Sequence, residues 1–184
     1  MQNKFSKRID RLTQELRNRG ISKTLVTNSS NIFYLTGIEI VPQERFIGLV
    51  ISSQCNELQL IIPELEKGDM IDNEILEVLY NDNEDPLIVL TDILGECSLL
   101  GVEKIFITLL RAETLKRYLE TREKCCCDLI EIGDILDKMR LYKEENEIED
   151  IKLAANYIDE ILYSVKNKIK VGVTEKQIKY EILR

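Results

Sequence analysis

Short runs of β-branched and aliphatic residues alternate with helical segments along most of this chain, and this alternation constrains the fold more than any other feature. The runs predict strands at residues 24–27, 46–53, 57–62, 76–80, 104–108 and 127–130. Strands that alternate with helices form a layered sheet covered on both faces. Only residues 54–56 separate the second run from the third, which predicts an antiparallel hairpin. We therefore expect an α/β fold with a mixed, about six-stranded sheet and helices on both faces.

The segments between the strands carry helix signals. An apolar stripe over residues 5–16 predicts the first helix, and Gly20 follows as its C-cap. Asn28 and Asp85 are residue types that cap helix N-termini, and each precedes an apolar segment. The remaining elements of this part are a short helix or turn at residues 32–35 and helices at 63–70, from 86 onward, at 112–123 and at 133–139.

A change in composition marks a second region. Charged and amide residues dominate residues 143–152, yet apolar residues keep helical spacing up to Val165, which predicts a long helix over residues 144–168. Gly172 then precedes Thr174, which begins an approximate capping box and a last helix. No glycine or capping residue ends that helix, so we expect the chain to stop within a longer structure. The predicted domains are residues 1–139 and 140–184, the latter with two helices.

The charge balance bears on the partners. With 25 basic and 33 acidic residues, the formal charge of -8 disfavours nucleic acid and anionic membranes, which require a basic surface. No apolar run approaches the ~20 residues that span a bilayer, and the basic residues near the start precede no apolar segment. We therefore expect a cytoplasmic protein that does not bind membranes.

Cysteine and histidine usage restricts the chemistry of the chain. The sequence has no histidine, and its five cysteines are Cys55, Cys97, Cys125, Cys126 and Cys127. Their odd number and the absence of C-x-x-C spacing disfavour both a disulfide framework and a zinc site. We expect thiols. The glycine-rich loop of nucleotide-binding proteins is also absent from the sequence.

Three separated motifs identify a family. The first consists of Asn31, Tyr34, Leu35, Thr36 and Gly37. The second is Pro-Glu-Leu-Glu at residues 63–66, and the third comprises Arg-x-x-Lys-x-x-x-Glu-Ile, Ala-Ala and Gly-x-Thr-Glu within residues 140–175. In this order they resemble the pita-bread metallopeptidases: the N-terminal domain shared by prolidases, proline aminopeptidases and creatinases, followed by the opening helices of the catalytic domain.

The resemblance implies a function for the parent protein. In this family two divalent ions, usually manganese, cobalt or zinc, are bound in the C-terminal domain by two Asp, one His and two Glu. The ions activate a water that attacks the bond preceding proline. Because this chain lacks histidine, the resemblance implies that the metal centre lies beyond Arg184 and that the chain alone is inactive. We therefore assign no catalytic residue and no metal ligand in this chain.

The resemblance also assigns a role to the N-terminal domain. It implies a homodimer in which the loop of residues 37–45 reaches the rim of an active site that cleaves proline-containing peptides. Where relatives often read Asp-Pro-His-Glu-Arg, this chain has Val41, Pro42, Gln43, Glu44 and Arg45. The candidate substrate-gating residues are Glu39, Gln43, Glu44 and Arg45. Alternatively, Glu44 and Arg45 form an ordinary loop ion pair worth under ~1 kcal/mol.

The first motif allows two interpretations. The phenol of Tyr34 could face the cleft, but an aromatic residue among apolar neighbours is more often part of the core. Asn31 could contact substrate, although hydrogen bonds from its side chain to the backbone of the turn are the favoured interpretation. Gly37 is expected to serve conformation, through a positive φ or a close approach.

Three functions remain open at this point. The favoured one is the dimerisation and substrate-gating domain of an Xaa-Pro dipeptidase or aminopeptidase. The alternatives are a creatinase-like amidinohydrolase domain and a noncatalytic interaction module of the same fold. The five metal ligands downstream would support an enzyme, and their absence would leave the interaction module.

Overall fold

The computed structural model describes residues 4–40, 44–67, 75–122 and 126–183 and divides into two compact units, Met1–Met139 and Arg140–Arg184. The strands are β1 (Lys23–Val26), β2 (Gly48–Ser52), β3 (Leu58–Pro63), β4 (Ile75–Tyr80), β5 (Leu99–Val102) and β6 (Asp128–Glu131). The helices are α1 (Lys4–Asn18), α2 (Ser29–Thr36), the 3-10 turn η1 (Glu64–Glu66), α3 (Pro86–Leu94), α4 (Leu109–Arg122), α5 (Gly133–Leu141), α6 (Glu145–Lys166) and α7 (Glu175–Ile182).

Within the described residues, one mixed sheet of six strands has the order β4-β3-β2-β1-β5-β6. The pairs β1–β2 and β2–β3 are antiparallel, and the other neighbours are parallel. The expected hairpin is therefore β2–β3, with Leu49 opposite Leu60. Strand β1 lies inside the sheet, because Thr24 pairs with Ile51 on one side and with Gly101 on the other.

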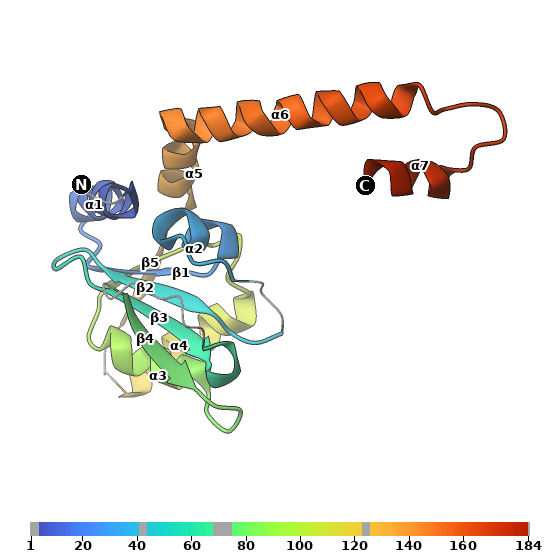
Figure 1. Cartoon of the computed structure of the whole chain (residues 1–184). Helices are drawn as coiled ribbons and strands as arrows, with labels where there is room; N and C mark the ends of the chain where they lie inside the picture. Colours follow the sequence, from blue (N-terminus) through green and yellow to red (C-terminus); the bar gives the residue numbers. More distant parts are fainter. Residues whose placement is uncertain (1–3, 41–43, 68–74, 123–125, 184) are drawn as a thin grey trace. The chain divides into compact units, whose positions relative to one another are not determined.

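Helices cover both faces of the sheet, as predicted (Figure 1). Side chains alternate between the faces along a strand, so Leu49 and Ile51 join one apolar cluster and Val50 joins the other. The first cluster includes buried residues of α1, α2 and α5, and the second includes those of α3 and α4. This double coverage explains why β2 is apolar over four successive residues.

The strand predicted at residues 104–108 is wrong. Residues 104–106 form a turn in which Ile105 is exposed, and the strand lies earlier, at Leu99–Val102. Gly101 makes this strand inconspicuous in the sequence, because glycine normally weakens a strand. Its neighbours require it: a Cβ at Gly101 would lie 2.5 Å from Oγ1 of Thr24 on β1. Close approach of two buried strands therefore overrides local β propensity here.

The helix predicted at residues 63–70 also differs from the structure. Pro63 is the last residue of β3, and only the single 3-10 turn Glu64–Glu66 follows it before Lys67. Residues 68–70 lie outside the described residues. The backbone of Pro63 explains the difference. Its ψ of 143° is extended, so Pro63 continues the strand and does not begin a helix.

The predicted N-caps form in both units. The Asn28 side chain accepts hydrogen bonds from the backbone N–H groups of Ser30 and Asn31 and thus begins α2. Asp85 accepts from the N–H of Leu87 at the start of α3. In the second unit, Thr174 and Gln177 form a capping box at α7. These local bonds satisfy backbone donors that the first helical turn leaves unpaired.

The second unit consists of α6 and α7. Most of the apolar side chains of α6 are exposed, including Ile151, Tyr157 and Leu162, whereas Val165 is buried. Among the described helices of the chain, none is both long and apolar enough to cross a membrane.

Candidate functional site

The predicted gating loop begins at Gly37, the C-cap of α2, and ends at Arg45, three residues before β2. Gly37 has φ +78°, and a Cβ there would lie 2.5 Å from the ring of Phe5, so the turn needs a glycine for both reasons. Glu39 and Glu44 are exposed. Gln43 lies outside the described residues.

Arg45 forms an ion pair with Asp82, the residue two positions after β4. A guanidinium nitrogen lies 2.9 Å from Oδ1 of Asp82 and donates to Oδ2 at 3.1 Å. The alternative interpretation paired Arg45 with its neighbour Glu44, whereas the structure gives it a partner 37 residues away. Both side chains are substantially exposed, so the pair contributes about 0–1 kcal/mol to stability. The ion pair joins the end of the loop to the β4–α3 connection and so fixes the position of Arg45.

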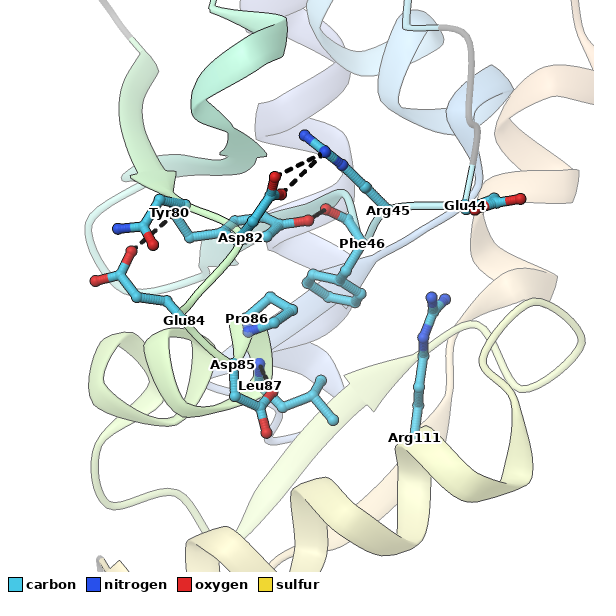
Figure 2. Close-up of a pocket in the computed structure, with 11 residues that line it drawn as sticks. Glu44, Arg45, Phe46, Tyr80, Asp82, Glu84, Asp85, Pro86, Leu87 and Arg111 are labelled. Carbon is cyan, nitrogen blue, oxygen red and sulfur yellow. Dashed lines mark hydrogen bonds and ion pairs between the residues drawn. The ribbon is translucent and has the colours of Figure 1, made fainter.

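This ion pair borders an open hollow of ≈ 340 Å³ (Figure 2). The hollow lies among the residues before β2, the β4–α3 connection and the start of α4, and is lined by Glu44, Arg45, Phe46, Tyr80, Asn81, Asp82, Glu84, Asp85, Pro86, Leu87 and Arg111. The guanidinium of Arg111 lies 5.4 Å from the centroid of the buried Phe46 ring. The Tyr80 hydroxyl donates to the carbonyl of Phe46 at 2.8 Å, and burial raises the pKa of this phenol.

The hollow is lined by charged side chains of both signs, Glu44, Asp82 and Arg111 among them, around the Phe46 ring. Its acidic side chains do not form a metal site: among the residues that the structure describes, no group of three or more His, Cys, Asp or Glu could hold a metal ion. The candidate site is therefore this hollow, which lies at the end of the predicted gating loop.

Asn31 of the first motif contacts a buried glutamate that the sequence did not indicate. Glu103 is 1% exposed and follows β5, beside the end of β1. Its Oε1 accepts a hydrogen bond from Nδ2 of Asn31 at 2.5 Å. Its Oε2 accepts from the backbone N–H groups of Thr27 and Asn28, at 2.7 and 2.9 Å. Glu103 thus attaches the start of α2 to the sheet. The predicted strand at residues 104–108 left Glu103 outside any strand, so the sequence did not indicate that it is buried.

Asn31 takes part in hydrogen bonds at the start of α2. The Asn31 amide donates to the Glu103 carboxylate, and the Asn28 side chain accepts from the backbone N–H groups of Ser30 and Asn31. The N–H of Asn31 is itself one of the donors that Asn28 caps. Asn31 therefore lies in a buried polar network between α2 and β5.

The other residues of the motif lie on α2 and pack. Leu35 is fully buried, and the Thr36 hydroxyl donates to the carbonyl of Ile32 at 2.7 Å. Tyr34 is half-buried against the first apolar cluster. Its hydroxyl donates to the carbonyl of Met139 at 3.2 Å, and the guanidinium of Arg8 lies 4.1 Å from its ring centroid. The motif thus connects α1, α2 and α5.

Two buried cysteines lie side by side at the starts of β5 and β6. The sulfurs of Cys97 and Cys127 are 3.5 Å apart, and both residues are thiols. The hydrogen bond from Cys127 and the positive charge of Lys23 lower the pKa of Cys97 to about 7, although burial opposes them. The sequence predicted thiols but gave no signal for this pairing, because 30 residues separate the two positions.

Comparisons with known proteins place this geometry in context. The family model described as Creatinase/Prolidase N-terminal domain matches residues 8–142. A Bacillus subtilis protein named "Putative dipeptidase YkvY" is 30% identical over 187 residues, which cover 95% of this chain and 49% of that protein. The chain thus spans about half the length of the curated relatives it matches.

Solved structures show the same fold. A prolidase from Thermococcus sibiricus matches with a TM-score of 0.80 and 23% identity, over 97% of this chain and 48% of that chain. The Creatinase/Prolidase N-terminal domain of an Xaa-Pro dipeptidase from Streptococcus pyogenes matches with a TM-score of 0.59 and 16% identity, over 72% of this chain and 98% of that one. The likeness to the longer protein extends over a larger share of this chain than the likeness to the isolated domain.

Proposed function

The chain belongs to the creatinase/prolidase N-terminal domain family, and from this premise we propose that it is the N-terminal part of an Xaa-Pro dipeptidase. The observation that carries the proposal is the family match over residues 8–142, together with a relative named as a dipeptidase at 30% identity. The prolidase likeness over 97% of the chain supports assigning α6 and α7 to the beginning of the catalytic domain.

In the proposed parent enzyme, residues outside this chain form the metal centre. The family resemblance implies two divalent ions, manganese, cobalt or zinc. The residues of this chain do not fit them, because the sequence lacks histidine and the described part holds no suitable cluster of ligands. We therefore assign no step of the hydrolysis to this chain and propose that it alone is inactive.

The first unit contributes to the parent enzyme by dimerisation and by gating the substrate. Glu39, Glu44 and Arg45 are proposed to meet proline-containing peptides at the rim of the active site. The support is local: Arg45 is fastened to Asp82 beside an open hollow, so the end of the loop has a defined anchor. The proposed assembly is a homodimer, and the proposed location is the cytoplasm.

An activity assay tests whether the chain alone is inactive while the parent enzyme is active. The purified 184-residue chain is incubated with an Xaa-Pro dipeptide and Mn²⁺, in parallel with the parent enzyme. We expect hydrolysis by the parent enzyme and none by the chain. Manganese-stimulated turnover by the chain alone would refute the proposal. Light scattering of both samples measures whether each is a dimer.

Substitutions in the parent enzyme test the gating role. Glu39→Gln and Arg45→Ala are expected to change KM or the preferred peptide length while bound metal stays constant. Glu120→Gln, at an exposed position of α4, is the matched control and should leave both unchanged. Loss of metal in either loop variant would show that the loop has been assigned the wrong role.

The family description also includes creatinases, so a creatinase-like amidinohydrolase is the second candidate. Assaying the parent enzyme on creatine and on an Xaa-Pro dipeptide separates the two activities. A parent protein that binds no divalent metal and cleaves neither substrate would favour the noncatalytic interaction module.

A further inference from the structure

The buried cysteines Cys97 and Cys127 form a pair that the proposed peptidase role does not use. Cys97 is 4% exposed and Cys127 is 5% exposed, and both belong to the second apolar cluster. Cys97 lies two residues before β5, and Cys127 immediately precedes β6. The parallel pairing of Leu99 with Asp128 brings these two strand starts together. The sulfur contact at 3.5 Å is therefore a consequence of strand register.

We propose that Cys97 and Cys127 are a reversible oxidation site, at which hydrogen peroxide converts the two thiols into a disulfide between the starts of β5 and β6. Forming the bond requires the two sulfurs to approach from 3.5 Å to the disulfide bond length of about 2.05 Å. The closed loop would contain α4, which lies between the two cysteines in sequence.

The chemistry balances with peroxide as the oxidant. The Cys97 thiolate attacks one peroxide oxygen, the O–O bond breaks, and Cys97 becomes a sulfenic acid while hydroxide leaves. The Cys127 sulfur then attacks the Cys97 sulfur, and the hydroxyl leaves as water with the proton of the Cys127 thiol. In total two thiols lose two hydrogens, and one peroxide becomes two waters once the hydroxide takes up the proton that Cys97 released.

The surroundings of Cys97 favour the first step. The thiolate is the reactive form, and a pKa of about 7 makes it abundant near neutral pH. Lys23 supplies a nearby positive charge, and its ammonium is held by the carbonyls of Ile93 and Leu94 at 2.8 and 2.5 Å. Access requires local opening, which an edge strand permits: β6 is the last strand of the sheet, and Asp128 and Cys126 are exposed.

Mass spectrometry tests the site on the 184-residue chain. The folded chain is treated with hydrogen peroxide, denatured, alkylated with N-ethylmaleimide and digested. We expect a peptide pair joined through Cys97 and Cys127, lighter by two hydrogens, that dithiothreitol separates. Cys97→Ser and Cys127→Ala should each abolish it, whereas Cys55→Ser, at an exposed cysteine outside the pair, should leave its yield unchanged.

Two outcomes would overturn the proposal. In one, Cys97 and Cys127 remain thiols while the exposed Cys55 and Cys126 are oxidised, and the pair then serves only as small core side chains. In the other, the cross-linked peptide joins Cys97 to a cysteine other than Cys127. The wild-type chain alone gives both results, so a variant that fails to fold does not affect the test.

Hydrogen exchange measures the structural consequence. A bond at the start of β6 should restrain the opening of this edge strand, so the amides of residues 128–131 should exchange more slowly in the oxidised chain and regain their original rate after reduction. The amides of β2, inside the sheet, are the internal reference. Equal exchange of β6 in both states would overturn the claim that the bond restrains this strand.

Discussion

The two units of this chain contain equally well-capped helices but use their apolar residues differently. In the first unit, α2 begins at the Asn28 cap, and its Leu35 is fully buried. In the second, α7 begins at the Thr174 capping box, yet no residue of α7 in the described part is buried. The long helix α6 likewise exposes Leu162, at 58%.

The difference separates helix formation from core formation. Caps and periodicity are local, so they form helices in both units. A core requires surfaces from distant parts of the chain, and the sheet of the first unit provides two of them, one on each face. We therefore expect most of the cooperative stability to reside in the first unit.

The largest expected difference comes from truncating matched leucines. Leu49→Ala, at a fully buried position of β2, should cost about 2–5 kcal/mol because it removes buried methyl groups and leaves a cavity. Leu162→Ala, at an exposed position of α6, should change stability by less than about 0.5 kcal/mol. Urea denaturation followed by circular dichroism measures both. Similar costs would mean that α6 has a buried core of its own.

Glutamates provide the second comparison. Glu103→Ala removes the acceptor for two backbone N–H groups and for the Asn31 amide, and we expect a loss of about 2–4 kcal/mol. Glu149→Ala, at an exposed position of α6, should cost under about 0.5 kcal/mol. The same urea titration serves as the measurement. A cost for Glu103→Ala no larger than the control would show that its three bonds contribute nothing net.

The pH dependence of stability should come partly from Cys97. Its pKa is about 7 in the folded chain and near 9.0 when unperturbed, so between these values the unfolded state holds a proton that the folded state has released. Stability from this group therefore increases from pH 7 to pH 9 and is lost as the pH falls through 7. We expect a gain on the order of 1–2 kcal/mol in wild type relative to Cys97→Ser. Parallel stability curves of the two proteins between pH 6 and 9 would contradict it.

The smallest expected effects distinguish two caps of similar chemistry. Asn28→Ala should lower the stability of the first unit by about 1 kcal/mol, because α2 belongs to its core. Thr174→Ala should cost α7 about the same amount locally while leaving the unfolding of the first unit unchanged. Hydrogen exchange resolves the two regions. Faster exchange in the sheet after Thr174→Ala would show that the units unfold together.

Local signals predicted the parts of the fold that depend on neighbouring residues. The Asn28, Asp85 and Thr174 caps, the β2–β3 hairpin and the α/β class with helices on both faces all followed from residues close together in sequence. Local signals did not predict the fifth strand. The close approach of Thr24 on the neighbouring strand leaves no room for a side chain at Gly101, and this contact is not local in sequence. The helix predicted from Pro63 was too long, because Pro63 is still part of β3.

The candidate site was harder to predict, because its contacts are long-range. Glu39, Gln43, Glu44 and Arg45 were selected through a family resemblance, and their gating role stays a prediction. The partner of Arg45 is 37 residues away, and the partner of Asn31 is 72 residues away. No local pattern indicates which acidic residue meets either one.

By itself, the sequence determined the kinds and order of the elements, the caps that begin the helices, and membership in a family through three motifs. Only the tertiary structure decided the strand order, the burial of Glu103 beneath α2, and the contact between Cys97 and Cys127. The physical reason is range: hydrogen bonds within a turn depend on adjacent residues, whereas sheet register brings together side chains that no spacing in the sequence connects.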